Sequence, residues 1–278
     1  GLAKDKPIII FIDELDRCRP DFAVSMLEII KHVFGVDGVQ FILVANSKQL
    51  KASINHCYGA GVEAQRYLDK FLKFSFQLSV KSVRNHSDSS FASITLYKNL
   101  INQSTYLKNN GLLDYEVQMF IENFIRNHPV SLREVETFIR YLEVLQILTE
   151  QRALYRGQQL GRQLITLLGV LIHCFKPELT LSINYRNYDA NAIGRFLHIR
   201  DVKPFPEGGS LPKVEEILMV IIARDCNLAT DFHLPTKDID KWDTVINKGL
   251  FDFPIKSGDA INNLNHVLEV LSLANDLR

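Results

Sequence analysis

The sequence predicts an α/β unit built on a parallel sheet, followed by a mainly helical C-terminal region. Two short apolar runs, residues 8–12 and 41–45, have the pattern of strands buried on both faces of a parallel sheet. Between them, apolar residues recur at spacings of three and four, which is the period of a helix. A strand, a helix and a second strand in this order form a parallel crossover unit. Beyond residue 90 the helical period dominates.

The first strand and the helix after it have clear boundaries. Pro7 precedes the strand, a position where proline is tolerated. Gly35 is a natural stop for the helix, and Asp37 with Gly38 predicts a turn into the second strand. The apolar positions of the helix are Phe22, Met26, Leu27, Ile30, Val33 and Phe34.

Three further elements complete the predicted α/β unit. Helices are expected over residues 48–57 and around Tyr67. Residues 73–78 predict a third strand, because large apolar residues alternate there with Ser75 and Gln77.

The rest of the chain predicts a polar loop followed by helices. Residues 81–90 are rich in Ser, Asn and His, which indicates a boundary loop. Helices are expected over residues 91–101, 115–126, 131–149, 160–175, 213–225 and 260–274. The predicted domains are therefore an α/β core at 1–80, a helical segment at 81–150 and a helical C-terminal module at 151–278.

The helix over residues 131–149 has a strong start signal. Ser131 is followed three residues later by Glu134, which is the spacing of a capping box. In that motif each side chain satisfies a backbone amide of the first turn. Arg133 is thereby predicted to lie in the first turn of a well-anchored helix.

Composition excludes several classes of protein. Lys+Arg and Asp+Glu are both 32, so the net charge indicates no nucleic-acid partner, although local basic patches remain open. The four cysteines are scattered, which favours a reducing cytoplasm over a disulfide framework. The longest nearly apolar run, residues 164–175, is shorter than the roughly 20 residues that span a bilayer.

Two acidic residues, Asp13 and Glu14, directly follow the first predicted strand. Ligands of open α/β sheets bind at the carboxyl ends of the strands. Chemistry at a nucleotide phosphate needs one carboxylate to hold Mg²⁺ and another to orient or deprotonate the attacking water. The plainer interpretation, that the pair only leaves the core into a turn, stays open at this point.

The segment over residues 11–18, FIDELDRC, resembles the Walker B segment of the KAP family of P-loop NTPases, which are relatives of the AAA+ and STAND ATPases. The resemblance continues through residues 67–71 and 132–135 and covers roughly residues 6–150. It implies that the α/β unit is a partial P-loop NTPase sheet, with ATP and Mg²⁺ as cofactors.

The resemblance assigns roles to four residues. Asp13 matches the Mg²⁺-associated Walker B aspartate, and Glu14 matches the catalytic glutamate beside it. Asn46 stands where related ATPases place a polar sensor, but a helix N-cap is an equal alternative. Arg133 corresponds to the phosphate-binding lid arginine, and a solvated arginine is its alternative. The pair Asp16 and Arg17 also matches, with a local salt bridge as its plainer role.

A phosphate-binding loop of the form G-x-x-x-x-G-K-S/T is absent from the 278 residues. We therefore expect this sequence to be part of a longer protein, with interior strand edges left unpaired by the missing segment. Many KAP proteins carry transmembrane helices between the phosphate loop and the acidic segment, so membrane attachment of the full protein stays open.

The functional hypothesis is ATP binding and slow hydrolysis, used as a conformational or oligomerisation switch with self-association or a partner protein. The resemblance also suggests bacterial phage defence. One alternative is a non-catalytic protein-interaction scaffold with a vestigial site, and another is a nucleic-acid-dependent ATPase. Arg152, Arg156 and Arg162 could form a basic face for nucleic acid, although a solvated helix surface is favoured.

Overall fold

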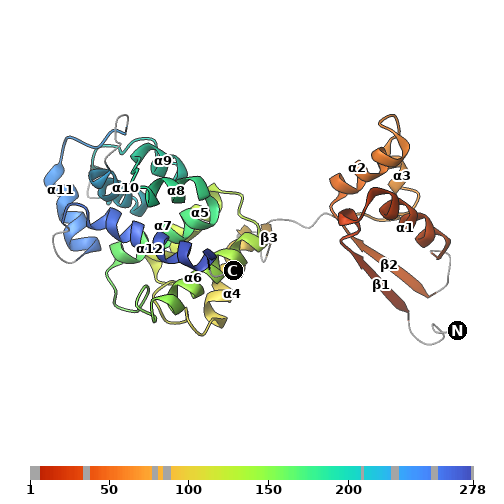
Figure 1. Ribbon diagram of the computed structural model, residues 1–278, viewed down its shortest axis with the longest axis horizontal. Helices are drawn as coiled ribbons and strands as arrows, with labels where there is room; N and C mark the ends of the chain where they lie inside the picture. Colours follow the sequence, from red (N-terminus) through yellow and green to blue (C-terminus); the bar gives the residue numbers. More distant parts are fainter. Residues whose placement is uncertain are drawn as a thin grey trace. The chain divides into compact units, whose positions relative to one another are not determined.

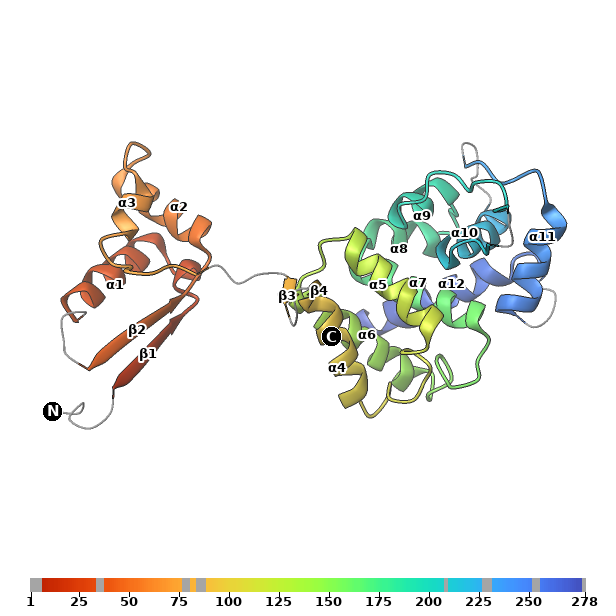
Figure 2. The ribbon, with the colours of Figure 1, turned by 180° about the vertical axis from the view of Figure 1, so that it is seen from behind.

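The computed structural model describes residues 7–33, 38–76, 81–83, 89–207, 210–226, 232–251 and 256–276. The chain divides into two compact units, residues 1–78 and 79–278. Figure 1 shows the elements of both units, and Figure 2 shows them from behind.

The first unit is a two-stranded parallel sheet with helices. β1 (Ile8–Asp13) and β2 (Val39–Val44) pair along their whole length, from Ile8 beside Val39 to Asp13 beside Val44. The crossover between them contains the single 3-10 turn η1 (Leu15–Arg17) and helix α1 (Pro20–Val33). Helices α2 (Ser47–Tyr58) and α3 (Ala64–Leu68) follow. The predicted parallel strand–helix–strand unit is confirmed.

The helices cover one face of this sheet (Figure 1). A small core between sheet and helices buries Leu15, Leu27, Leu50, Ile54 and Leu68. The opposite face is exposed, and Phe11 on β1 keeps 66% of its surface in solvent. The prediction of strands buried on both faces is therefore wrong for the described residues, because only one layer of helices packs on the sheet.

The predicted third strand does not form where the structure describes it. Residues 73–76 have no strand structure, while residues 77 and 78 lie outside the described residues. Phe74 and Phe76 are 79% and 88% exposed. An alternating pattern becomes a strand only when a neighbouring strand accepts its backbone hydrogen bonds, and no neighbour is present among the described residues.

The second unit begins with a short hairpin and continues as helices. β3 (Lys81–Val83) pairs antiparallel with β4 (Ser89–Phe91), so the expected boundary loop over 81–90 is wrong at both of its ends. The helices of this unit are α4 (Ala92–Gln103), α5 (Tyr115–Asn127), α6 (Leu132–Leu148), α7 (Leu160–Phe175), α8 (Pro177–Asn184), α9 (Ala190–Phe196), α10 (Val214–Asp225), α11 (Ile239–Thr244), the π-helical segment η2 (Val245–Leu250) and α12 (Asp259–Asp276).

One hydrophobic core holds the second unit together. It extends from Ile94 on α4 to Leu271 on α12, and α7 lies at its centre with buried residues on all sides. The predicted boundary near residue 150 falls between α6 and α7, which share this core. In the described part of the chain, no helix combines the length and apolar character that a membrane crossing requires.

Candidate functional site

The acidic pair sits where the chain leaves the sheet. Asp13 is the last residue of β1 and lies beside Val44 on β2. The Glu14 N–H donates to Val44 O (3.1 Å) and to Asp13 Oδ1 (2.7 Å). Glu14 adopts a left-handed backbone conformation, φ 59° and ψ 25°, which is uncommon for a residue other than glycine. The chain thus turns sharply directly after Asp13, and such conformations cluster at functional sites.

Both carboxylates are exposed to solvent. Glu14 Oε1 forms an ion pair with Arg17 Nη1 at 2.9 Å, and both side chains are about half exposed, so the pair contributes little stability. The predicted local salt bridge therefore involves Arg17, with Glu14 rather than Asp16 as its partner. The second carboxylate oxygen of Asp13 receives no hydrogen bond from the described residues.

Asn46 lies at the same edge of the sheet as the acidic pair, because it follows β2 and the two strands are parallel. Its Oδ1 accepts from the N–H groups of Lys48 (3.1 Å) and Gln49 (3.3 Å), which makes it the N-cap of α2. The capping alternative is therefore observed. These bonds use only the amide oxygen, so the sensor role of Asn46 stays a prediction.

Arg133 lies in the second unit, in the first turn of α6. The predicted capping box is confirmed: Glu134 N donates to Ser131 Oγ (3.3 Å) and Ser131 N donates to Glu134 Oε2 (2.7 Å). Arg133 is exposed to solvent. Its role at a nucleotide phosphate stays a prediction.

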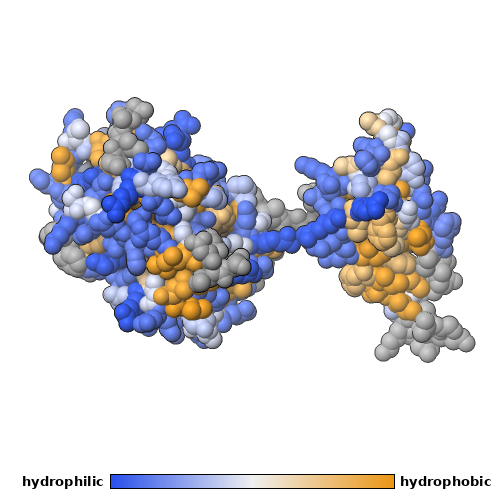
Figure 3. Space-filling view, viewed as in Figure 1, coloured by the Kyte–Doolittle hydropathy of each residue, from blue (hydrophilic) through white to orange (hydrophobic). Residues whose placement is uncertain are grey.

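The described part of the sheet beside the acidic pair has two strands. Within the described residues, β1 and β2 have no strand neighbours other than each other. Their uncovered side, here called the bare sheet face, carries Ile9, Phe11, Ile42 and Val44, all more than 40% exposed. Figure 3 shows apolar residues gathered at the surface over the two strands. Contiguous exposed apolar surface of this kind normally marks an interaction site.

The residues present suit a magnesium ion better than a tightly caged metal. Among the described residues, no group of three His, Cys, Asp or Glu side chains lies close enough to hold a metal ion. Mg²⁺ usually keeps several waters and takes one or two carboxylates together with phosphate oxygens. Asp13 is exposed, and one of its carboxylate oxygens accepts no hydrogen bond from the described residues, so it fits that requirement.

Sequence reasoning missed Arg17 as the partner of Glu14. The signal was present, since the two residues are three apart and carry opposite charges. The pattern was equally compatible with a pair between Asp16 and Arg17, and the structure shows the pair with Glu14.

A parallel strand–helix–strand unit with carboxylates at the carboxyl edge of its sheet is the architecture of a nucleotide-binding α/β protein. The model of the KAP family P-loop domain matches residues 2–149, which is more than half of the 278 residues. The chain belongs to the KAP family of P-loop NTPases. Comparison with curated proteins and with solved structures gave no match. Membership of this family implies nucleotide binding in general terms.

Proposed function

We propose that the first unit supplies the acidic half of an ATP-hydrolysing site. Asp13 would hold Mg²⁺ through its retained waters, and Glu14 would orient the attacking water and accept its proton. The ion, when bound, neutralises charge that develops on the phosphate oxygens. Asn46 and Arg133 are the further candidates for contact with the γ-phosphate.

The observation that carries this proposal is the position of Asp13 and Glu14. They are adjacent and exposed; Asp13 is the last paired residue of β1 and Glu14 follows it, at the carboxyl edge of a parallel sheet. Ligands of open α/β sheets bind at this edge. Arg17, held 2.9 Å from Glu14, can orient the glutamate carboxylate in the absence of substrate.

Hydrolysis also requires a cradle for the phosphates. The 278 residues contain no G-x-x-x-x-G-K-S/T loop, so the proposed site is complete only with a segment from outside this sequence. Among the residues that the structure describes, the outer edges of β1 and β2 have no strand partner, and these edges and the bare sheet face are compatible with such an addition, because further strands and helices would bury them.

We also propose that nucleotide binding controls association, as a conformational or oligomerisation switch. The support is the bare sheet face, whose exposure would change when other segments or subunits pack on it. The role in phage defence stays a prediction of the family resemblance.

The test is ATP turnover by the full-length protein and its Glu14→Gln variant. Loss of the general base predicts a fall in turnover of about 10²-fold or more, with ATP binding retained. Asp21→Asn is the matched control, since Asp21 is an exposed acid in the first turn of α1 that pairs with Arg19 and should leave turnover unchanged. Sedimentation of the same samples with and without ATP reports on the proposed switch.

Equal turnover in the parent protein and the Glu14→Gln variant would remove the catalytic role of Glu14. If neither protein hydrolyses ATP, the result would favour the alternative hypothesis of a non-catalytic scaffold with a vestigial site. An unchanged sedimentation coefficient with ATP would argue against an oligomerisation switch.

A further inference from the structure

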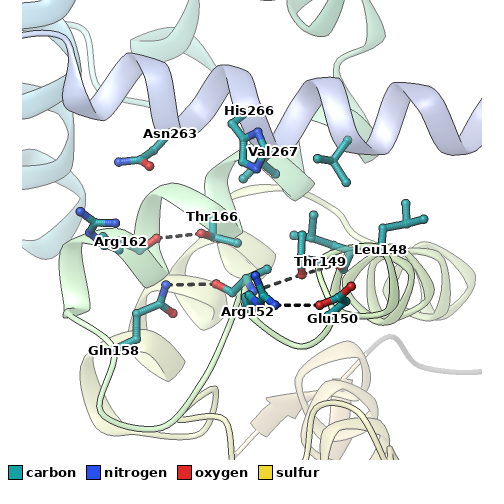
Figure 4. A pocket seen from close by; sticks show the side chains of 13 residues that line it. Leu148, Thr149, Glu150, Arg152, Gln158, Arg162, Thr166, Asn263, His266 and Val267 are labelled. Carbon is teal, nitrogen blue, oxygen red and sulfur yellow. Dashed lines mark hydrogen bonds and ion pairs between the residues drawn. The ribbon is translucent and has the colours of Figure 1, made fainter.

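The second unit contains a cavity of about 530 Å³ between the end of α6, the start of α7 and the middle of α12. Figure 4 shows the side chains that line it. A volume of this size is typical of small-molecule sites. Most of the lining residues lie beyond residue 149, outside the part of the chain that the family model matches.

The inner wall of the cavity is apolar. Leu145 on α6 and Val267 on α12 are buried core residues that also line the cavity. Leu148 and Val270 extend this apolar wall toward the rim. The apolar portion of a bound ligand would therefore bury its own hydrocarbon surface and that of the cavity wall, and removal of both surfaces from water favours binding.

The rim of the cavity carries two arginines and one acidic side chain. Arg152, from the loop after α6, and Arg162, from the first turn of α7, both line it, and His266 of α12 lies opposite them (Figure 4). Glu150 is the one acidic residue of the lining. It pairs with Arg152 at 2.8 Å, but these side chains are 77% and 80% exposed, so the pair is weak and readily exchanged.

Arg162 retains unused donors. Its Nε donates to Gln159 Oε1 at 3.1 Å, while its two terminal amino groups have no partner among the described residues. A guanidinium binds carboxylate or phosphate through two parallel hydrogen bonds, which makes an anionic group the natural partner.

The loop that carries Arg152 is held firmly in place. The side chain of the fully buried Gln146 makes two hydrogen bonds to the backbone of Leu154. Its Nε2 donates to Leu154 O (2.8 Å), and its Oε1 accepts from Leu154 N (2.9 Å). Within the loop, Glu150 and Gln151 both adopt left-handed conformations, with φ of 51° and 62°. Such conformations persist only where the surrounding structure enforces them. Arg152 thus projects from a fixed backbone rather than from a freely moving loop.

One polar atom of the lining lacks a partner. Gln158 donates from Nε2 to Ala153 O at 3.1 Å, but its buried Oε1 accepts no hydrogen bond from the described residues. Buried polar atoms are nearly always paired, so a donor from a ligand or water is expected there.

We propose that this cavity binds a small anionic molecule with an apolar portion, its carboxylate or phosphate held by Arg152 and Arg162. The apolar wall favours a ligand with a hydrocarbon portion, and the two arginines favour a ligand with a negatively charged group. The site is independent of the proposed ATPase chemistry, because none of Asp13, Glu14, Asn46 and Arg133 lines the cavity.

The test is calorimetric titration of the full chain with octanoate and octyl phosphate, beside the uncharged 1-octanol. At least one anionic probe should bind, and 1-octanol should bind at least tenfold more weakly. Arg152→Gln and Arg162→Gln should each weaken the anionic probe about tenfold or more, since each removes charge-assisted hydrogen bonds.

Arg156→Gln is the matched control. Arg156 is an exposed arginine of the same loop that does not line the cavity, so its removal should leave the affinity unchanged. Val270→Phe, which fills the apolar wall, should weaken both anionic probes while Arg152 and Arg162 remain in place.

Several results would overturn the proposal: no binding of either anionic probe, equal binding of 1-octanol, or an equal loss in Arg156→Gln. A single-stranded oligonucleotide that bound and lost affinity equally in all three arginine variants would point to a basic nucleic-acid surface instead. ATP turnover is not the readout, so failure of the ATPase proposal would leave this test intact.

Discussion

At the scale of single residues, Glu122 on α5 shows how an ionised side chain is accommodated near the core. Its side chain is 11% exposed and accepts from Lys98 Nζ (2.8 Å), Arg126 Nη2 (3.2 Å) and Gln118 Nε2 (2.8 Å). Burial alone would raise the pKa of Glu122, but the hydrogen bonds from Lys98 and Arg126 outweigh it and lower the pKa.

We predict that Glu122→Gln lowers the free energy of unfolding by about 1–3 kcal/mol at pH 7, because it weakens the charge-assisted hydrogen bonds that Lys98 and Arg126 donate to this largely buried carboxylate. Urea unfolding measures this quantity. The control is Glu116→Gln, an exposed acid on the same helix, which should change stability by at most a few tenths of a kcal/mol. Equal effects of the two changes would show that Glu122 is not a structural anchor.

At the scale of elements, the contact between α7 and α12 depends on a glycine. A Cβ at Gly169 on α7 would approach Val267 Cγ1 on α12 to 2.7 Å, and β-branched side chains have little freedom to move aside. Alanine is otherwise favoured over glycine in a helix by about 1 kcal/mol. The close approach of the two helices thus reverses the usual preference.

We predict that Gly169→Ala destabilises the second unit by about 1–3 kcal/mol, as expected for overpacking. The fluorescence of Trp242, the only tryptophan and a buried residue of this unit, reports the unfolding. Gly249→Ala is the control, because a Cβ there meets no atom closer than 4.0 Å. A Gly169→Ala protein at least as stable as the parent would contradict the packing argument.

At the scale of the whole molecule, the pH dependence of stability involves His128 in the second unit, whose pKa is lowered in the folded state. His128 stacks on Phe124, with ring centroids 4.0 Å apart, and lies against Phe196. Burial lowers the pKa of His128, and the nearby charges of His198 and Lys176 lower it further, against hydrogen bonds with the backbone of Phe124 and Phe196 that raise it.

We predict that the second unit loses stability in two steps as the pH falls. Because the pKa of His128 is lowered in the folded state, the unfolded chain binds a proton at this residue below about pH 6.5 while the folded protein stays unprotonated there. The free energy of unfolding therefore decreases as the pH falls. Below about pH 4.3 Glu122 has the same effect. Its pKa is lowered in the folded state, so its carboxylate is protonated more readily in the unfolded chain, and the free energy of unfolding decreases further. Urea unfolding, followed by Trp242 fluorescence, tests this prediction when it is repeated about every half pH unit between roughly pH 3.5 and 8.

His128→Phe keeps the stacking and removes the titrating group, so its stability should fall less between pH 7 and pH 5 than that of the parent. An identical slope in both proteins would assign the pH dependence to other groups.

The parts of the molecule that could be predicted from sequence are those encoded over short distances. Helical periodicity located α1, α2, α4, α5, α6, α7, α10 and α12, and the motif at Ser131 located the start of α6. The helix expected around Tyr67 is the five-residue α3, whereas the short helices α8, α9 and α11 were not predicted, since six to eight residues give few turns in which to recognise a period. The strand predicted at 73–78 failed over 73–76 because strand formation depends on a neighbour, which local sequence does not specify.

Local sequence is sufficient for the parallel strand–helix–strand order, the acidic pair after the first strand, the capping box and the family. Each is a matter of residue types at short, fixed spacings, and backbone geometry converts such spacings directly into structure. The folded structure was needed to show that one face of the sheet is exposed among the described residues, that Arg17 pairs with Glu14, and that Arg152, Arg162 and His266 line one cavity. These features depend on residues far apart in the chain or on a single turn of the backbone, and packing of the whole unit determines which of them meet.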